Sequence, residues 1–160
     1  MATVRVQLEA FDTGAELARL LAGRTDIGGI GAFVGVVRGA AHEASLEALT
    51  LEHYPGMTGK ALAAIAAEAE ARWNLLGCTV IHRYGRLVPG DPIVLVLAAS
   101  AHREPALAAT SFLIDWLKTR APFWKQEQRE DGSSYWVEAS EADDQAAARW
   151  EFGTTASAPR

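Results

Sequence analysis

The 160-residue sequence contains one cysteine and has no long apolar run. Cys78 alone cannot form an intramolecular disulfide or a multi-cysteine zinc site. The protein is therefore neither a disulfide-stabilised small domain nor a zinc-stabilised one built on several cysteines. No apolar run approaches the ~18–20 residues that a membrane-spanning helix requires. Because the N-terminal residues also lack the pattern of a signal peptide, we expect a protein of the reducing cytoplasm.

Positive charge is also in short supply. Lys and Arg total 15 against 20 Asp and Glu, which gives a net charge of −5. This balance argues against a general nucleic-acid-binding protein, although it leaves room for a local basic pocket that holds a small anion. The hydrophobic fraction of 49% is typical of a soluble globular protein and excludes general disorder.

Hydrophobic periodicity predicts alternating strands and helices. Strands are expected over 4–8, 30–38, 46–53, 79–84, 93–98, 123–127 and 135–138, and helices over 15–22, 57–73, 105–120 and 141–150. The segment Ile93–Ala98 is apolar at every position, which is typical of a central strand. The mixture of helices with an antiparallel-looking sheet predicts an α+β fold. A chain of this length is most simply one domain, which we expect over residues 1–151, with a flexible tail over 152–160.

Three local patterns make specific structural predictions. Thr13 and Glu16 have the spacing of a capping box, in which each side chain satisfies a free backbone N–H at a helix start. The glycines within Ile30–Arg38 indicate a bulge or a close approach by another chain or a ligand. Pro122 prevents the preceding helix from continuing.

Lysine is scarce, and two of the three lysines lie close together in the sequence. Lys118 is expected in the last turn of a helix, and Lys125 just beyond the break at Pro122; the third is Lys60. A lysine in an apolar setting has a lowered pKa and can act as a base, a nucleophile or a donor to an anion. Alternatively, the two positive charges near the C-terminus of the helix interact favourably with its dipole and are solvated at the surface.

A second candidate cluster joins the central strand to the following helix. His102 and Arg103 lie where free N–H groups and the helix dipole favour an anion. The other interpretation is a solvated loop in which Ser100 or Glu104 caps the helix. Arg38 ends an apolar strand and could be a third cation of the same pocket, or an ordinary strand-end arginine.

The remaining histidines, the cysteine and the glycine-rich segments are better explained by structural roles than by catalysis or ligand binding. His53 and His82 lie singly on strands, which is typical of hydrogen-bonded core or interface histidines. No histidine pair has metal-ligand spacing, so no metal site is expected. Cys78 is interpreted as a small buried hydrophobe. The glycine run over residues 29–35 lacks the spacing of a dinucleotide fingerprint. Residues 56–61 (GMTGKA) lack both the spacing of a P-loop and its Ser or Thr after the lysine.

Several separated and unusual strings occur in a fixed order along the chain. They are residues 31–38 (GAFVGVVR), 51–57 (LEHYPGM), 82–87 (HRYGRL) with 90–91 (GD), 100–103 (SAHR), 112–127 and 136–138 (WVE). Together they resemble the MoaE family, the large (catalytic) subunits of molybdopterin synthase. The likeness covers the chain from about residue 3 to Trp150 and makes residues 1–151 a single MoaE-like catalytic domain.

The resemblance implies an α/β hammerhead-like fold with a mainly antiparallel sheet and flanking helices. It implies a sulfurtransferase of molybdenum cofactor biosynthesis. The sulfur would come from the thiocarboxylated C-terminal glycine of a small ubiquitin-like (MoaD-type) carrier subunit. Two sulfurs would be added to cyclic pyranopterin monophosphate to form the molybdopterin dithiolene. The large subunits would form a homodimer within a heterotetramer, and no metal or organic cofactor is implied.

The resemblance also assigns site residues. It implies that Lys118 and Lys125 are catalytic. The substrate-binding residues would be Arg38, His102 and Arg103, the last two contributed partly across the dimer. The carrier-tail pocket would include Phe33 and Glu127.

Two other functions compete with this one. The first is a non-enzymatic dimeric module that binds a ubiquitin-like partner, which would need a groove but not two pocket lysines. The second is a hydrolase or acyl transferase with His102 as its base, which no G-x-S-x-G elbow supports.

Overall fold

A computed structural model describes residues 1–41, 44–138 and 140–156. In chain order the elements are β1 (Thr3–Gln7), α1 (Thr13–Leu21), β2 (Gly29–Val36), β3 (Ala40–Ala41), β4 (Ala44–His53), α2 (Met57–Trp73), β5 (Gly77–Arg83), β6 (Gly85–Leu87), β7 (Pro92–Ser100), α3 (Arg103–Thr119), β8 (Phe123–Arg129), β9 (Ser134–Val137) and α4 (Glu141–Ala156). No helix in these ranges is long and apolar enough to cross a membrane.

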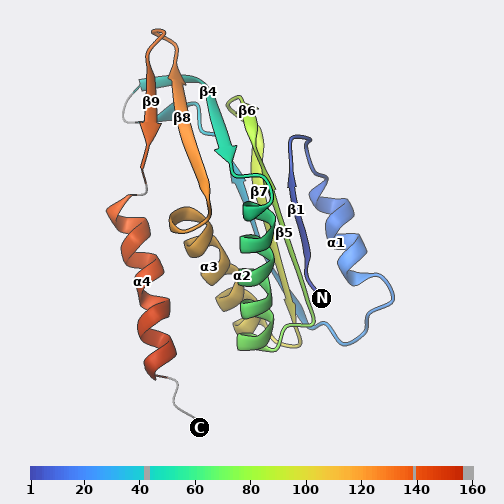
Figure 1. Cartoon of the computed structure of the whole chain (residues 1–160). Coiled ribbons are helices and arrows are strands. Elements are labelled where there is room, and N and C mark those ends of the chain that lie inside the picture. Colours follow the sequence, from blue (N-terminus) through green and yellow to red (C-terminus); the bar gives the residue numbers. More distant parts are fainter. Residues whose placement is uncertain (42–43, 139, 157–160) are drawn as a thin grey trace.

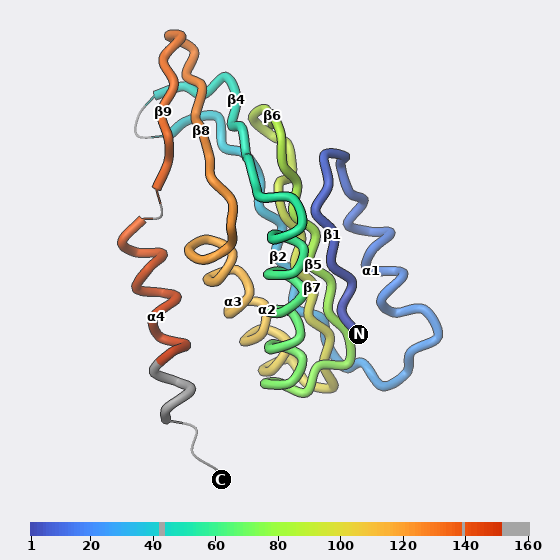
Figure 2. Tube along the Cα trace, in the orientation of Figure 1, coloured from blue at the N-terminus to red at the C-terminus, as the bar shows by residue number. Residues whose placement is uncertain are grey.

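The strands form two sheets. One has four strands in the order β1-β5-β7-β2, with β1 and β5 parallel and the other pairs antiparallel. The second has the order β3-β4-β8-β9, and β6 pairs with β4 beside this path. The β8–β9 hairpin extends beyond the first sheet, and α4 then runs back alongside α3 (Figures 1 and 2). The predicted α+β fold with a mainly antiparallel sheet is confirmed.

The core lies on both faces of the four-stranded sheet. Val94 and Val96 of β7 belong to the cluster that packs against α2 and α3. Leu95 and Leu97, which point to the opposite face, pack with residues of α1. Figure 1 shows α1 on the other side of this sheet from α2 and α3. The prediction that the apolar strand is central is therefore confirmed.

Element boundaries agree best with the sequence where a turn residue marks them. The helix expected over 57–73 is α2, which begins after Gly56, at φ +84°, and ends at Asn74 in the left-handed conformation. The short strands β3 and β6 were not predicted. Helix α4 continues past Trp150 to Ala156, so residues 152–156 of the expected tail are helical. The remainder of that tail, 157–160, lies outside the described residues.

The predicted capping box at the start of α1 is wrong. The helix is capped by Asp12, whose Oδ1 accepts the backbone N–H of Ala15 at 2.9 Å, and Thr13 is the first helical residue. The carboxylate of Asp12 therefore caps the helix, as the hydroxyl of Thr13 was expected to do. The Glu16 side chain makes bonds elsewhere and does not reach back to the cap.

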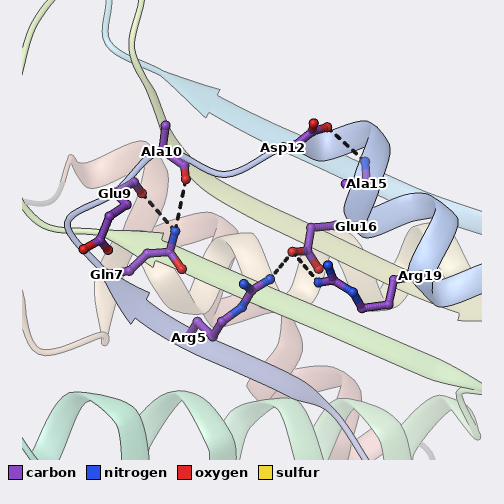
Figure 3. A network of polar contacts seen from close by, with 8 residues as sticks. All are labelled: Arg5, Gln7, Glu9, Ala10, Asp12, Ala15, Glu16 and Arg19. Carbon is purple, nitrogen blue, oxygen red and sulfur yellow. Dashed lines mark hydrogen bonds and ion pairs between the residues drawn. The ribbon is translucent and has the colours of Figure 1, made fainter.

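Glu16 instead joins α1 to β1. It is buried and forms ion pairs with Arg5 of β1 and, at 2.8 Å, with Arg19 one turn along α1 (Figure 3). Burial works against its charge, but the hydrogen bonds and charges of the two arginines outweigh this and lower the pKa of the carboxyl. The N-terminal strand and helix are thus held together by a buried carboxylate.

The glycines within β2 serve a bulge, as predicted, and a close approach that is made by α3 of the same chain rather than by another chain or a ligand. A Cβ at Gly31 would lie 2.5 Å from the carbonyl oxygen of Ala106 and would also meet the Thr110 hydroxyl, so only glycine lets β2 approach α3 this closely. The register with β7 shifts between Gly35 and Val36, which is an irregularity of the bulge type.

We therefore predict that Gly31→Ala destabilises the protein by about 1–3 kcal/mol, because the new methyl group must push α3 away from β2. Gly59→Ala in α2 is the matched control, since a Cβ there meets nothing within 4 Å and helix propensity favours alanine. Urea unfolding of both variants measures the difference. Equal stability of Gly31→Ala and the wild type would contradict the close packing of β2 on α3.

Candidate functional site

The chain reverses between α3 and β8, and this reversal places two lysines together. After the last turn of α3, the N–H of Arg120 bonds to the carbonyl of Trp116 at 2.8 Å. β8 then begins at Phe123, directly after Pro122. Lys118, in the last helical turn, and Lys125, in the strand, line the same cleft. Both expected positions are confirmed.

The cleft has a volume of about 620 Å³ and lies between the end of β2, the end of α3, β8, and the start of α4. Two smaller cavities adjoin it, of about 180 Å³ and 160 Å³. Arg38, Lys118 and Lys125 line all three. Three cations, one from the segment after β2, one from the last turn of α3 and one from β8, therefore converge here, in a protein whose net charge is −5.

Lys125 is the more perturbed of the two lysines. It is half-buried between neighbours on β4 and β9. Burial lowers its pKa to about 8, and the nearby charge of Lys118 lowers it too, while Asp143 acts in the opposite direction. At pH 7 the ammonium form still exceeds the amine by about tenfold, and near pH 8 the two forms are equal. Lys125 can therefore act as a cation or as a proton carrier close to neutrality.

The two residues expected in the carrier-tail pocket border the same space. Glu127 is buried, follows Lys125 by two residues on β8 and so shares its face of the strand. Its carboxylate lies 3.7 Å from the guanidinium of Arg129. Phe33 of β2 lines the 180 Å³ lobe. The cleft thus has an acidic side chain on β8 and an aromatic wall on β2.

His102 and Arg103 lie elsewhere. They are exposed at the N-terminal end of α3, whereas Lys118 is in its last turn. The separation of 15 residues corresponds to about 22 Å along an α-helix. One chain therefore does not bring these two residues to the lysines, and their contribution across a dimer stays a prediction.

Sequence reasoning did not place His82 in the cleft. It was expected to be a hydrogen-bonded core histidine; its Nδ1 does bond to the carbonyl of Arg83 at 2.8 Å, but the ring also lines the cleft. Glu138 and Asp143, at the start of the C-terminal segment, were likewise not singled out. A lone histidine in a strand carries no spacing pattern, and the only indication was its place in the string 82–87.

Cys78 matches its interpretation as a small buried hydrophobe. It is 1% exposed in β5 and belongs to the cluster beneath α2 and α3. Burial, together with the charge of Glu70, raises the pKa of its thiol to about 12. The thiol is therefore protonated at physiological pH and is not a nucleophile. Within the described residues, no group of three or more His, Cys, Asp or Glu side chains could hold a metal ion.

We predict that trace acetylation of the folded protein will label Lys125 with a midpoint near pH 8, because burial and Lys118 both disfavour its ammonium form. Peptide mass spectrometry after denaturation and complete labelling gives the extent at each pH. Lys60, exposed on α2, provides an internal reference for reagent reactivity. The variant Lys118→Met should raise the Lys125 midpoint, and an unchanged midpoint would contradict the coupling of the two charges.

Comparison with known proteins gives a consistent result. Residues 6–120 match the family model described as MoaE protein. The chain is 56% identical over 149 residues to a molybdopterin synthase catalytic subunit from Mesorhizobium japonicum, covering 92% of each chain.

Solved structures agree in fold. A molybdopterin biosynthesis MoaE protein from Burkholderia ambifaria has a TM-score of 0.80 and 49% identity, covering 94% of this chain and 99% of that one. A molybdopterin synthase from Staphylococcus aureus has a TM-score of 0.74 and 32% identity, covering 82% and 94%. The sequence strings, the α+β fold and these matches along most of the chain lead to one conclusion: the chain belongs to the MoaE family.

Proposed function

We propose that this protein is the catalytic subunit of a molybdopterin synthase. It would transfer sulfur from the thiocarboxylated C-terminus of a small ubiquitin-like carrier to cyclic pyranopterin monophosphate, forming the dithiolene of molybdopterin. The observation that carries the proposal is the convergence of Arg38, Lys118 and Lys125 on one cleft in an acidic protein. Membership of the MoaE family supports the same reaction.

The reaction brings two anions together, which explains the need for these cations. The substrate carries a cyclic phosphate and the attacking sulfur belongs to a thiocarboxylate, so each repels the other unless positive charge lies between them. In the proposed sequence the carrier sulfur forms a bond to a substrate carbon as a carbon–oxygen bond at that carbon breaks, and the departing oxygen takes a proton from Lys125 acting as general acid. Water then cleaves the bond between the carrier's acyl carbon and the sulfur. The carrier leaves as a carboxylate, and a second carrier delivers the second sulfur.

Each cation has a separate role in this proposal. Arg38 holds the substrate phosphate at the end of β2. Lys118 orients the carrier's terminal carbonyl and stabilises negative charge on it. Lys125, whose pKa of about 8 lets it exchange a proton near neutrality, serves as general acid/base or electrostatic partner.

The proposed dimer follows from the distance between the two groups of site residues within one chain. His102 and Arg103 lie about 22 Å along α3 from Lys118, so a second copy would have to supply them to the substrate. We therefore propose a homodimer with one carrier docked at each end, working in the cytoplasm. The narrow lobe beside Phe33 would receive the carrier tail, and Glu127 would border it.

The test is reconstituted sulfur transfer with purified protein, thiocarboxylated carrier and cyclic pyranopterin monophosphate. Product is measured as the fluorescent oxidation derivative of the dithiolene. We expect Lys118→Ala and Lys125→Ala to lose activity by about 10²–10⁴-fold, because each removes a cation from the reacting centre. Lys60→Ala, on the exposed face of α2, is the matched control and should retain full activity.

Two outcomes would change this picture in different ways. If folded wild-type protein binds the carrier but forms no product, the non-enzymatic docking module becomes the better description. If both lysine variants match the wild type, the enzyme stands but the roles given to its lysines do not.

A separate prediction concerns Cys78. Because sulfur arrives on the carrier and the thiol is buried and protonated, Cys78→Ala should transfer sulfur at a rate within about twofold of the wild type. The same fluorescence assay measures it, with circular dichroism to verify folding. A folded but inactive Cys78→Ala would mean that the sulfur passes through the protein itself.

A further inference from the structure

His82 is held rigidly at the wall of the cleft. Its ring stacks on Phe123 with centroids 3.9 Å apart and planes tilted by 19°. Its Nδ1 donates a hydrogen bond to the carbonyl oxygen of Arg83 at 2.8 Å. The residue is 5% exposed. Such a ring cannot rotate without losing both contacts.

The hydrogen bond at Nδ1 decides what the other ring nitrogen can do. A neutral imidazole carries one proton, and the carbonyl acceptor places it on Nδ1, so Nε2 is an acceptor. Burial lowers the pKa of His82 to about 4; the Arg83 carbonyl opposes this, while Lys125 on β8, Lys118 on α3 and His53 on β4 add to it. The ring therefore stays neutral throughout the physiological range.

His82 lines the 180 Å³ lobe, and because Nδ1 is engaged by the Arg83 carbonyl, Nε2 is the ring nitrogen left to serve an occupant. Among the described residues it has no hydrogen-bond partner, yet it is not one of the fully enclosed unpaired atoms. Besides His82, the charged or hydrogen-bonding side chains that line this lobe are Arg38, Lys118 and Lys125. All three are donors only. Among the described residues that line the lobe, His82 thus contributes the one neutral side-chain acceptor, and the others offer positive charge and apolar walls.

This combination fits an occupant that has an anion and an N–H donor within one residue. A peptide C-terminus has this arrangement, because the terminal carboxylate or thiocarboxylate lies one carbon from its own amide N–H. We propose that Nε2 of His82 accepts a hydrogen bond from the last amide N–H of the carrier tail. His82 would then be a positioning residue that fixes the terminal glycine while the lysines contact its acyl group. The inference rests on the proposed function, since the occupant is the carrier.

The proposal separates the carrier tail from other small anions. A phosphodiester or an ionised carboxylate, which has no proton to donate, would satisfy the three cations but leave Nε2 unpaired, as would a tail without the last N–H. The hydrogen bond to Nε2 also fixes how deeply the carrier tail enters the lobe. The acyl carbon of the terminal glycine is separated from its own amide nitrogen by one carbon, so holding that nitrogen places the acyl carbon.

The test replaces one atom of the carrier. A small subunit of a molybdopterin synthase is completed by chemical ligation so that its tail ends in glycine or in glycolic acid. The second tail has an ester oxygen in place of the last amide N–H and a weaker carbonyl acceptor beside it, and the comparison with a His82 variant separates the two effects. Calorimetry gives the dissociation constant of each carrier for wild-type protein and for His82→Phe, which keeps a neutral ring against Phe123 but has no acceptor.

We expect the ester carrier to bind wild-type protein about 3- to 10-fold more weakly than the glycine carrier, as for one lost hydrogen bond. His82→Phe should bind the two carriers equally, because its acceptor is already gone. An equal penalty for the ester in both proteins would assign the loss to the tail alone and overturn the proposal. Equal binding of both carriers to wild-type protein would overturn it without reference to any variant.

A second variant distinguishes acceptance of the hydrogen bond from general support of the fold. His82→Gln offers a side-chain carbonyl, so it should regain part of the preference for glycine over glycolate that His82→Phe loses. A merely structural role predicts no such recovery. If the glycine carrier does not bind wild-type protein at all, both the proposed function and this inference fail. If wild-type protein binds the glycine and ester carriers equally, only the role given to His82 fails.

Discussion

The fixed ring of Pro122 constrains the centre of this molecule. Because proline lacks an N–H and clashes with a preceding helical carbonyl, α3 cannot run on. The chain turns within a few residues, and β8 begins beside the end of the helix it follows. Three walls of the cleft depend on this turn: the last turn of α3, the inner face of β8, and the hairpin partner β9 that leads into α4. A longer helix would have carried Lys125 away from Lys118.

Neighbouring groups in the cleft reduce the electrostatic repulsion between its three cations. Two ammonium groups and a guanidinium repel one another, and partial burial of Lys125 adds a desolvation penalty that its lowered pKa records. Glu127, Glu138 and Asp143 border the same space and temper the repulsion. His82, which remains neutral, adds a polar group without a fourth charge. The cleft is therefore positive enough to attract anions while its cations remain close together.

The sequence predicts those features that a local pattern controls. Gly56 and Asn74 bracket α2, the uniformly apolar β7 lies between two layers, and the glycines of β2 stand where α3 comes close and where the register shifts. Strands of two or three residues, such as β3 and β6, have no period to detect. The choice of Asp12 over Thr13 as helix cap is invisible in the pattern, because both residue types cap helices well.

The candidate site divides in the same way. Lys118 and Lys125 are near in sequence and flank a proline, so their meeting could be predicted. The role of His82 could not, since it depends on which faces of β5, β8 and α3 enclose a common space. The separation of His102 and Arg103 from the lysines follows from the length of α3, which places the two pairs at opposite ends of one helix.

The parallel pairing of β1 with β5 governs the order in which the protein can be assembled during synthesis. Thr3 lies opposite Thr79, so the first strand to leave the ribosome has no partner until some 76 residues later. At typical rates of translation this delay is about 4–15 s. During that time the ion pair between Arg5 and Glu16 is too weak to hold β1 against α1, because an ion pair in water is worth only about 0–1 kcal/mol. The first strand therefore joins its sheet only when β5 arrives, and the cleft is completed later still, by the C-terminal third of the chain.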